Sequence, residues 1–135
     1  MTSNRKLGND FETEFCEILA KNGYWVHNFA LKKSGQPADV IAVKNRTASL
    51  IDCKVCENDK FPFSRIEENQ ELSMKLWEDC GNDRGWFALK TSKGIYMLSH
   101  FFTDDIYNVG FSSCTRKSLN LSEIEEKAYK LEEWI

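Results

Sequence analysis

Two acids and a lysine lie close together in the chain, between residues 39 and 54. Asp39 comes directly before a short apolar run, and Asp52 and Lys54 lie in a second apolar run of strand length. Side chains two residues apart on a strand point to the same face, so Asp52 and Lys54 share a face while Cys53 points away from it. If the two runs pair, Asp39 comes beside them. Two carboxylates and an ammonium group at one point can hold a divalent metal ion and a phosphate.

The same residues also have an ordinary structural interpretation, a surface hairpin with a salt-bridged acid and a lysine at a strand end. The D-x-K spacing is short and is easily met by chance. Asp39 favours the functional interpretation. It follows Pro37 and begins an apolar strand, and an acid in that position is costly to bury without a partner.

Hydrophobic periodicity predicts the elements that must position these residues. We expect strands over 24–29, 39–43 and 49–54, the last two forming a hairpin, and further strands over 85–89 and 94–98. The first expected helix is capped at Asn9 or Asp10, with Glu12 in a capping box, and the second runs from about Ser64 to Cys80. We also expect a short helix over 100–107. A last helix, with Ser122 and Glu125 as capping box, runs to Ile135. Residues 109–120 are unassigned. This order predicts an α/β sandwich with a mixed sheet of about five strands, mainly antiparallel hairpins, flanked by helices.

Length and composition indicate one domain over residues 1–135, with a polar, flexible arm over 1–8. The chain has 18 basic and 21 acidic residues and a net charge of −3, which argues against a bulk-charge nucleic-acid binder but allows a local basic patch. We recognise no signal peptide and no membrane-spanning run, and five cysteines, an odd number, fit reduced thiols. We therefore expect a cytoplasmic protein with no membrane partner and no small-molecule cofactor.

Pro37-Ala38-Asp39 followed by Asp52-Cys53-Lys54 resembles the PD-(D/E)XK nuclease pattern. More closely, three segments are similar to the RecU-type Holliday junction resolvases and occur in the family's order over about residues 8–107: Gly8 to Glu12, Ile51 to Lys54, and Phe61 to Ile66 continuing to Gln70. The resemblance implies a restriction-endonuclease-like fold. Two features depart from the RecU pattern. The motif acid is Asp52 where glutamate is more frequent, and only residues 31–38 replace a long stalk, as in the compact archaeal junction resolvases.

By this resemblance, the metal ligands are Glu12, which is the helix acid, with Asp39, Asp52 and the backbone carbonyl of Cys53. Lys54 is the catalytic lysine, and Gln70 lies on the following helix. The family implies hydrolysis of phosphodiester bonds with Mg²⁺, or Mn²⁺, by a homodimer that nicks two strands of branched DNA symmetrically. The residues alone leave Glu12 open as a capping-box acid. Gln70 lies in an apolar helix stripe, where an unpaired amide would cost about 1–3 kcal/mol. It is therefore either a satisfied core amide or a residue of the site.

Candidate DNA contacts surround the first metal acid. Their basic side chains or backbone N–H groups could hold phosphates, although ordinary solvated charge is the alternative. These residues are Lys32, Lys33, Ser34 and Gly35, directly before Asp39, together with Arg5, Lys6 and Arg65.

Other functions stay open. A nuclease of the same fold could act on other DNA in repair, restriction or packaging, and a non-catalytic DNA-binding module could keep the same residues. Cys53 and Cys56 form a C-x-x-C, for which a redox role or, with Cys80 or Cys114, a zinc role is a distant third. His27 and His100 are interpreted as structural. The four tryptophans are interpreted as core residues rather than base-stacking platforms: Trp25, Trp77, Trp86 and Trp134.

Overall fold

The computed structural model of this protein describes residues 4–29, 38–101 and 118–135. Its centre is a six-stranded sheet in the order β1-β2-β3-β5-β6-β8. The strands are β1 (Trp25–Asn28), β2 (Val40–Lys44), β3 (Thr47–Val55), β5 (Trp86–Thr91), β6 (Gly94–Ser99) and β8 (Tyr129–Lys130). A separate two-stranded sheet pairs β4 (Phe61–Pro62) with β7 (Ser118–Leu119). The α/β architecture with a mixed sheet is as predicted, with one strand more than the expected five.

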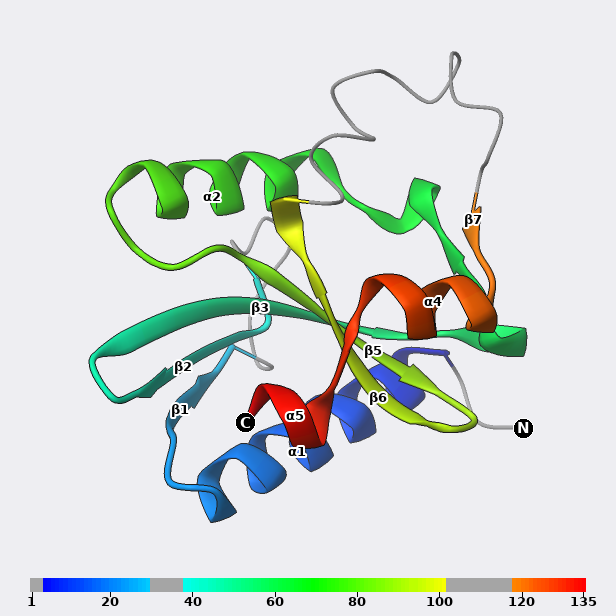
Figure 1. Cartoon of the computed structure of the whole chain (residues 1–135), viewed down its shortest axis with the longest axis horizontal. Coiled ribbons are helices and arrows are strands. Elements are labelled where there is room, and N and C mark those ends of the chain that lie inside the picture. The colour runs from blue at the N-terminus through cyan, green and yellow to red at the C-terminus, as the bar shows by residue number, and fades with distance from the viewer. Residues whose placement is uncertain (1–3, 30–37, 102–117) are drawn as a thin grey trace.

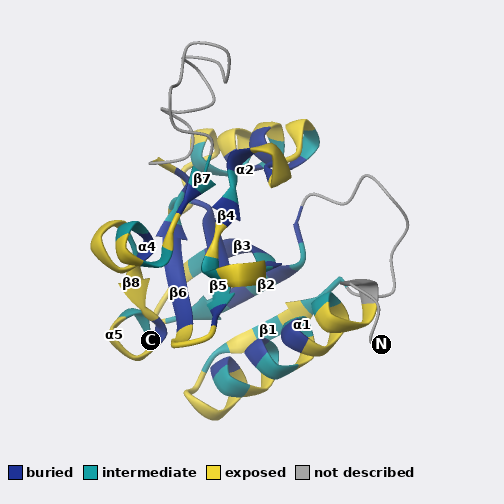
Figure 2. Cartoon of the chain, turned by 90° about the vertical axis from the view of Figure 1, so that its right-hand side faces the viewer, coloured by how far each residue is buried: buried dark blue, intermediate teal, exposed yellow. Residues whose placement is uncertain are grey.

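Helices cover both faces of the large sheet (Figure 1). They are α1 (Asn4–Lys21), α2 (Glu68–Asp79), α4 (Leu121–Lys127) and α5 (Leu131–Trp134), with short 3-10 turns at Glu57–Asp59 and Phe63–Arg65. The hydrophobic core is divided accordingly. One cluster joins the sheet to α2 and α4, and the other joins it to α1 and α5. Burial is concentrated in the central strands between these layers (Figure 2).

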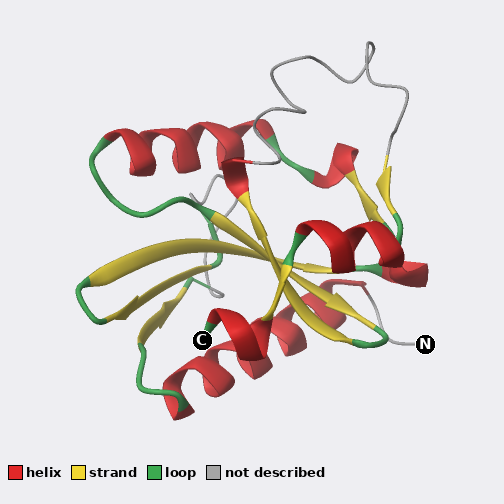
Figure 3. Ribbon diagram, in the orientation of Figure 1, coloured by secondary structure: helices red, strands yellow, loops and turns green. Residues whose placement is uncertain are grey.

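The sheet changes direction at its centre. Strands β3 and β5 pair in parallel, whereas the other strand pairs in the described ranges are antiparallel. A parallel pair requires a crossover connection, and the segment that contains α2 provides it (Figure 3). This crossover brings α2 over the face of β3 that carries Asp52 and Lys54.

The hairpin between β2 and β3 confirms the predicted pairing of the two motif strands. Its register pairs Val40 with Ile51 and Lys44 with Thr47. The two turn residues, Asn45 and Arg46, have φ angles of 52° and 66°. Positive φ at both central residues is the mark of a type I′ turn, whose twist matches that of the flanking strands.

Two helix starts differ from the prediction. The first helix begins at Asn4 rather than at Asn9 or Asp10, so the capping box with Glu12 is wrong and residues 4–8 are helical rather than an arm. Leu7 stands four residues before Phe11 and extends the apolar stripe by one turn. The second helix begins at Glu68, because Phe63–Arg65 form a separate 3-10 turn in place of the start expected at Ser64.

The C-terminal segment is also divided where the sequence predicts one helix. A capping box is present, but Asn120 and Glu123 form it, and the helix ends at Lys127. Tyr129 and Lys130 then pair with β6 before α5 begins. Helical periodicity continues across this break, so sheet pairing overrides the local pattern.

Three further expectations concern other parts of the chain. Of the helix expected over 100–107, only the first two residues are described, and they are helical; the unassigned stretch is described only from Ser118, which begins β7. No helix in the described part of the chain is long and apolar enough to cross a membrane. Trp86 is buried as predicted, but Trp25 is 62% exposed, so its interpretation as a core residue is wrong.

Candidate active site

The site lies at the start of β2, where β3 extends beyond its partner strand. The last pair of the β2–β3 ladder joins Val40 and Ile51, and the N–H of Asp39 still donates to the carbonyl of Ile51 at 3.1 Å. One step further, the side chain of Asp39 replaces the missing strand, since its Oδ2 accepts from the backbone N–H of Cys53 at 2.8 Å. Asp39 therefore stands beside the exposed edge of β3, close to the motif acid.

Asp52 and Lys54 point to the α2 side of the sheet, as their spacing predicts. Both are buried, and Lys54 Nζ lies 2.9 Å from Asp52 Oδ2. Gln70 on α2 contacts both, because its Nε2 donates to Asp52 Oδ1 at 2.9 Å and its Oε1 accepts from Lys54 Nζ at 3.3 Å. Gln70 is thus a buried amide that faces the acid–lysine pair, and each of its polar atoms has a partner there.

One oxygen of Asp52 is incompletely satisfied. Its Oδ2 is buried, and although Lys54 Nζ is near, no donor in the described ranges is aligned with it for a hydrogen bond. A buried carboxylate oxygen without an aligned donor is costly. It is also an available ligand position for a cation.

Glu12 reaches the site from the opposite side of the sheet, on the third turn of α1. It is half-buried and near enough for Asp39, Asp52 and Lys54 to affect its pKa, and Asp52 likewise affects the pKa of Asp39. The three predicted acids are therefore neighbours. Within the described residues, no three Asp, Glu, His or Cys side chains form a group that could hold a metal by themselves.

Burial raises the pKa of each of the three acids. For Asp52 it raises the pKa well above the ordinary value, more than the neighbouring Lys54 charge lowers it, and the charge of Asp39 raises it further. For Asp39 burial is again the largest cause, partly offset by its hydrogen bonds to Asp52 and Cys53. Burial also raises the pKa of Glu12. A neighbouring negative charge disfavours the ionised form of a carboxyl group and a positive charge favours it, and in the described site Lys54 is the one cation among the causes that lower these pKa values.

This arrangement fits a hard divalent cation. Mg²⁺ is held by one or two carboxylates and keeps several waters, so a three-acid cage is not required. Two carboxylates are available for such an ion, that of Asp39 and that of Asp52, whose Oδ2 has no aligned donor. The excess of acidic over basic groups in the site also favours a cation. The N–H and C=O of one strand residue point to the same edge. Because the N–H of Cys53 bonds Asp39, its carbonyl faces the same edge as the carboxylate of Asp39.

The predicted DNA contacts are distributed around this region. Arg65 lies beside β3, where its Nη1 donates to the carbonyl of Val55 at 2.5 Å. It lines a cavity of about 290 Å³ together with Lys60 and Cys53. Lys6 is exposed on α1 and pairs with Asp10 at 3.1 Å. Arg5 belongs to α1, but its side chain is not described, and Lys32, Lys33, Ser34 and Gly35 lie outside the described residues.

The cysteine motif gains no support as a redox or zinc site. Cys53 and Cys56 are both free thiols. Burial raises the pKa of the Cys56 thiol to about 12 and that of Cys53 well above its ordinary value. Thiolates are the reactive and metal-binding form, so this surrounding disfavours both chemistries.

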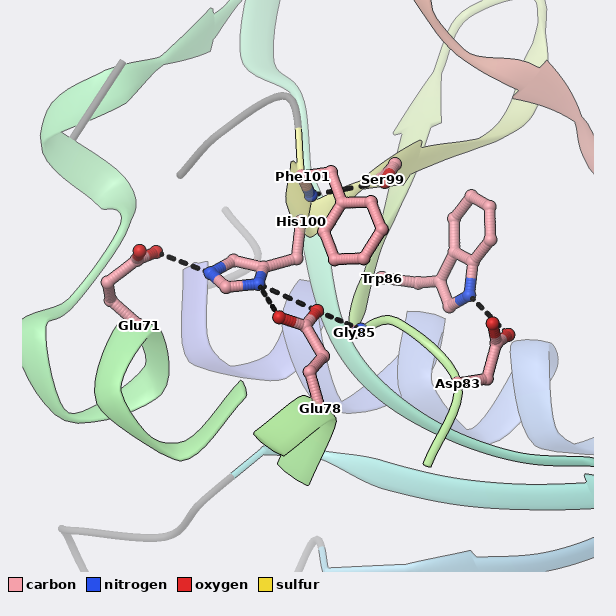
Figure 4. A network of polar contacts seen from close by, with 8 residues as sticks. All are labelled: Glu71, Glu78, Asp83, Gly85, Trp86, Ser99, His100 and Phe101. Atoms are coloured by element: carbon pink, nitrogen blue, oxygen red, sulfur yellow. Dashed lines mark hydrogen bonds and ion pairs between the residues drawn. The ribbon is translucent and has the colours of Figure 1, made fainter. Parts of the chain in front are cut away.

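A second buried polar cluster joins His100 to Glu71 and Glu78, and we call it the His100 cluster (Figure 4). The sequence analysis did not predict that these three residues meet. His100 Nε2 lies 2.9 Å from Glu71 Oε2, and Nδ1 lies 2.8 Å from Glu78 Oε2. Both ring nitrogens face carboxylates, which requires both to donate, as in the imidazolium form. Burial alone lowers the pKa of His100, but the two glutamates outweigh it and the pKa is raised.

The His100 cluster fixes α2 to the sheet. Glu78 also accepts from the N–H of Gly85, at the entry to β5, at 2.7 Å (Figure 4). Gly85 must be glycine in this packing, because a Cβ there would lie 2.6 Å from Met74 Cγ. Glu71 follows Gln70 directly in α2, so the anchor and the site residue are neighbours. In the sequence, the spacing of seven residues between Glu71 and Glu78 indicates that both acids lie on one face of the helix.

The fold and the site together define the class. A mixed sheet flanked by helices, with Asp39, Asp52 and Lys54 beside one strand end, is the restriction-endonuclease-like arrangement that the motif resembles. A family model described as archaeal Holliday junction resolvase (Hjc) matches residues 3–132. The chain belongs to this family, which is the archaeal rather than the RecU type of the two that the sequence resembles.

A solved structure agrees on the fold. Hjc from Archaeoglobus fulgidus, a Holliday junction resolvase from an archaeal hyperthermophile, superimposes with a TM-score of 0.67 at 16% sequence identity. The match covers 94% of this chain and 98% of that chain. No curated protein matches the sequence significantly.

Proposed function

We propose that this protein is a metal-dependent endodeoxyribonuclease that resolves four-way DNA junctions. Membership of the archaeal Holliday junction resolvase family supports a nuclease that acts on branched DNA. The observation that supports the chemistry is the meeting of Asp39, Asp52 and Lys54 at the edge where β2 begins. Because the proposed substrate is DNA, we expect the protein in the cytoplasm.

Asp39, Asp52 and the carbonyl of Cys53 are the proposed ligands for Mg²⁺, with Mn²⁺ as a substitute. A bound divalent ion supplies a Lewis acid that polarises the phosphodiester and lowers the pKa of water. The buried carboxyl groups favour such an ion, since it removes the cost of ionising them beside one another. Glu12, near Asp39, is proposed as the acid that completes the negative rim of the site.

Lys54 and Gln70 have separate proposed roles. Lys54 can move from Asp52 Oδ2 toward a phosphate oxygen once positive charge is supplied to Asp52, which gives the scissile phosphate a fixed ammonium partner. Gln70 holds Asp52 Oδ1 and accepts from Lys54, so it sets the orientation of both side chains. Gln70 is therefore a positioning residue in this proposal.

DNA outside the cleaved bond is proposed to contact basic side chains around the site. Arg65 and Lys60 are both exposed and line the cavity beside Cys53. Arg5 and Lys6, at the start of α1, and the segment Lys32, Lys33, Ser34 and Gly35 remain predictions of the sequence. Each phosphate contact is expected to steepen the salt dependence of binding.

A homodimer is proposed because symmetric nicking of a four-way junction requires two sites. The exposed face of α2 carries Leu72 and Leu76, which are 58% and 65% exposed and one turn apart. Apolar pairs of this kind are candidates for an interface between copies. Light scattering after size-exclusion chromatography measures the oligomeric state, and a monomer under nicking conditions would contradict the dimer.

Strand nicking tests the proposed function directly. The purified protein is incubated with a synthetic four-way junction, a flap and a linear duplex, each with Mg²⁺, Mn²⁺ or a chelator. We expect paired nicks in the junction, little cleavage of linear duplex, and none with the chelator. Cleavage of all three DNAs alike would indicate a general nuclease, and metal-dependent binding without product would indicate a binding module.

The metal assignment has a readout that does not depend on cleavage. A ligand that binds only the folded protein stabilises it by about 2.7 kcal/mol at a hundredfold excess over its dissociation constant. Mg²⁺ should therefore raise the melting temperature of the wild type and leave that of Asp52→Ala unchanged. Equal shifts in both proteins would contradict Asp52 as a ligand.

A further inference from the structure

Three aromatic side chains follow one face of β1 and its continuation. Trp25 is 62% exposed, His27 is exposed and Phe29 is half-buried. The ring planes of Trp25 and His27 are 14° from parallel with centroids 6.4 Å apart, and His27 meets Phe29 edge-on at 4.7 Å. We call these three residues the aromatic row. A large aromatic side chain left in solvent on an edge strand is unusual and points to a partner.

The aromatic row lies on the same face of the sheet as the candidate active site. Val26 packs into the α1-side core, so its neighbours Trp25 and His27 point to the other face, where Asp52 and Lys54 also point. The register carries the row to the site itself. His27 pairs with Ile41, and one step beyond the last pair the N–H of Phe29 donates to the carbonyl of Asp39 at 2.8 Å.

The sequence around the aromatic row is basic. Residues 21–51 contain five Lys or Arg and Asp39 as the one acid, although the whole chain has a net charge of −3. Among the described residues, Arg46 is exposed in the turn two residues after Lys44, whereas Lys44 serves the α1 side, where its Nζ donates to the carbonyl of Asn22 at 2.8 Å and lies over the Tyr24 ring. Exposed aromatic faces are typical of surfaces on which the bases of unpaired nucleic-acid strands stack. Because the row leads directly to Asp39, the partner that fits it is the DNA of the proposed function.

The orientation of the rings also fits stacking on bases. The Trp25 and His27 rings are nearly parallel, with centroids 6.4 Å apart, and aromatic faces of this kind are what unpaired bases stack on. From Trp25 to Phe29 the row covers five residues, and the four steps between them span roughly 13 Å at the rise of a strand. Its length therefore suits a few nucleotides rather than a duplex.

We propose that the aromatic row is a stacking platform for the unpaired or unstacked bases at a DNA branch point. A base rests on Trp25 and His27, and the strand continues past Phe29 so that its phosphate lies at Asp39 and Asp52. The platform gives the protein preference for branched over fully paired DNA. This inference rests on the proposed function, since it takes the acid site as the place of cleavage.

The test compares Trp25→Ala with Tyr129→Ala. Tyr129 is 52% exposed and lies in β8, the opposite edge strand, so it controls for loss of an exposed ring. Binding is measured without divalent metal, using a four-way junction with 2-aminopurine at the branch point and a linear duplex of the same length. We expect Trp25→Ala to bind the junction about 10-fold more weakly and to lose the fluorescence change, with duplex binding altered less. Trp25→Phe should recover much of both, and Tyr129→Ala should behave as the wild type.

Three results would overturn the inference, and they are distinct from failure of the proposed function. The first is wild-type junction binding by a folded Trp25→Ala protein. The second is an equal loss for Tyr129→Ala. The third is a change of oligomeric state in Trp25→Ala, which would make the row an interface between copies. If the wild type nicks junctions while any of these holds, the stacking platform alone is wrong. If the wild type neither binds nor nicks branched DNA, the proposed function fails with it.

Discussion

Helix α2 separates two buried charge clusters that differ in how completely their charges are matched. In the His100 cluster, two carboxylates face both nitrogens of one imidazolium, and Gly85 adds a backbone donor. In the acid–lysine site, Glu12, Asp39 and Asp52 face one ammonium group, and Asp52 Oδ2 has no aligned donor among the described residues. The first cluster sets two carboxylates against one cation and the second sets three against one, so the acid–lysine site has the larger excess of negative charge. In the proposed function a bound divalent ion offsets that excess.

The sharpest test of this difference is Asp52→Asn. The amide keeps the shape but removes the charge, so we expect nicking to fall by about 1,000-fold or more, as when a charge-stabilising group is lost from an active site. Metal-free stability should change little, since burial no longer opposes an ionised Asp52 but Lys54 loses its charged partner. Single-turnover nicking and urea unfolding measure the two effects. Asp10→Asn, an exposed acid on α1, is the matched control.

Breaking the His100 cluster should have the opposite result. His100→Ala leaves Glu71 and Glu78 buried without their shared cation, and removing one partner of a buried pair costs about 3–5 kcal/mol. Urea unfolding measures this, with His27→Ala as the exposed control. A loss below about 1 kcal/mol would mean that the cluster stabilises little. If the variant does not fold, Glu78→Gln gives a milder break, and nicking by that variant shows whether the anchor also positions Gln70.

The His100 cluster should also weaken at high pH. Because the folded-state pKa of His100 is raised above its unfolded value, its contribution is fully present below about pH 6.5. It is lost as the pH rises through the folded-state pKa. The NMR titration of the His100 ring in the wild type measures that pKa directly. A ring that titrates below the ordinary histidine value of about 6.5 would contradict the imidazolium assignment.

The smallest effect is expected at a surface pair outside both clusters. Lys6 and Asp10 lie one turn apart on α1 with their side chains 66% and 62% exposed. Exposed pairs of this kind contribute little, so Lys6→Ala should change the free energy of unfolding by no more than about 0.5 kcal/mol. If Lys6 holds a DNA phosphate, the same variant lowers the salt dependence of binding by about one unit of slope. An unchanged slope would remove it from the DNA contacts.

The sequence predicted the parts of the site that depend on short spacing. Asp52 and Lys54 share a face because strands alternate, and the hairpin that brings Asp39 near them is local. Gln70 could be recognised as a polar residue in an apolar stripe. Glu12 is different. Its position near Asp39 depends on the packing of α1 against the sheet, and only the family resemblance indicated it.

The parts that could not be predicted depend on contacts between distant segments. The carboxylate of Asp39 accepts the hydrogen bond that the backbone N–H of Cys53 would otherwise give to a neighbouring strand. No spacing rule in the sequence predicts that contact. The His100 cluster joins residues 22 and 29 positions apart. The break at Tyr129 exists because β6 offers an unpaired edge, and a helical pattern in the sequence carries no information about that edge.

The hydrogen bond from Phe29 to Asp39 has a consequence for the length of chain between them, because it ties together the two ends of that segment. When the ends of a segment are held, each doubling of its length costs only about 0.6 kcal/mol of closure entropy. The chain therefore has a position before Asp39 where residues can be inserted at small cost in stability while Asp39 keeps its place beside β3.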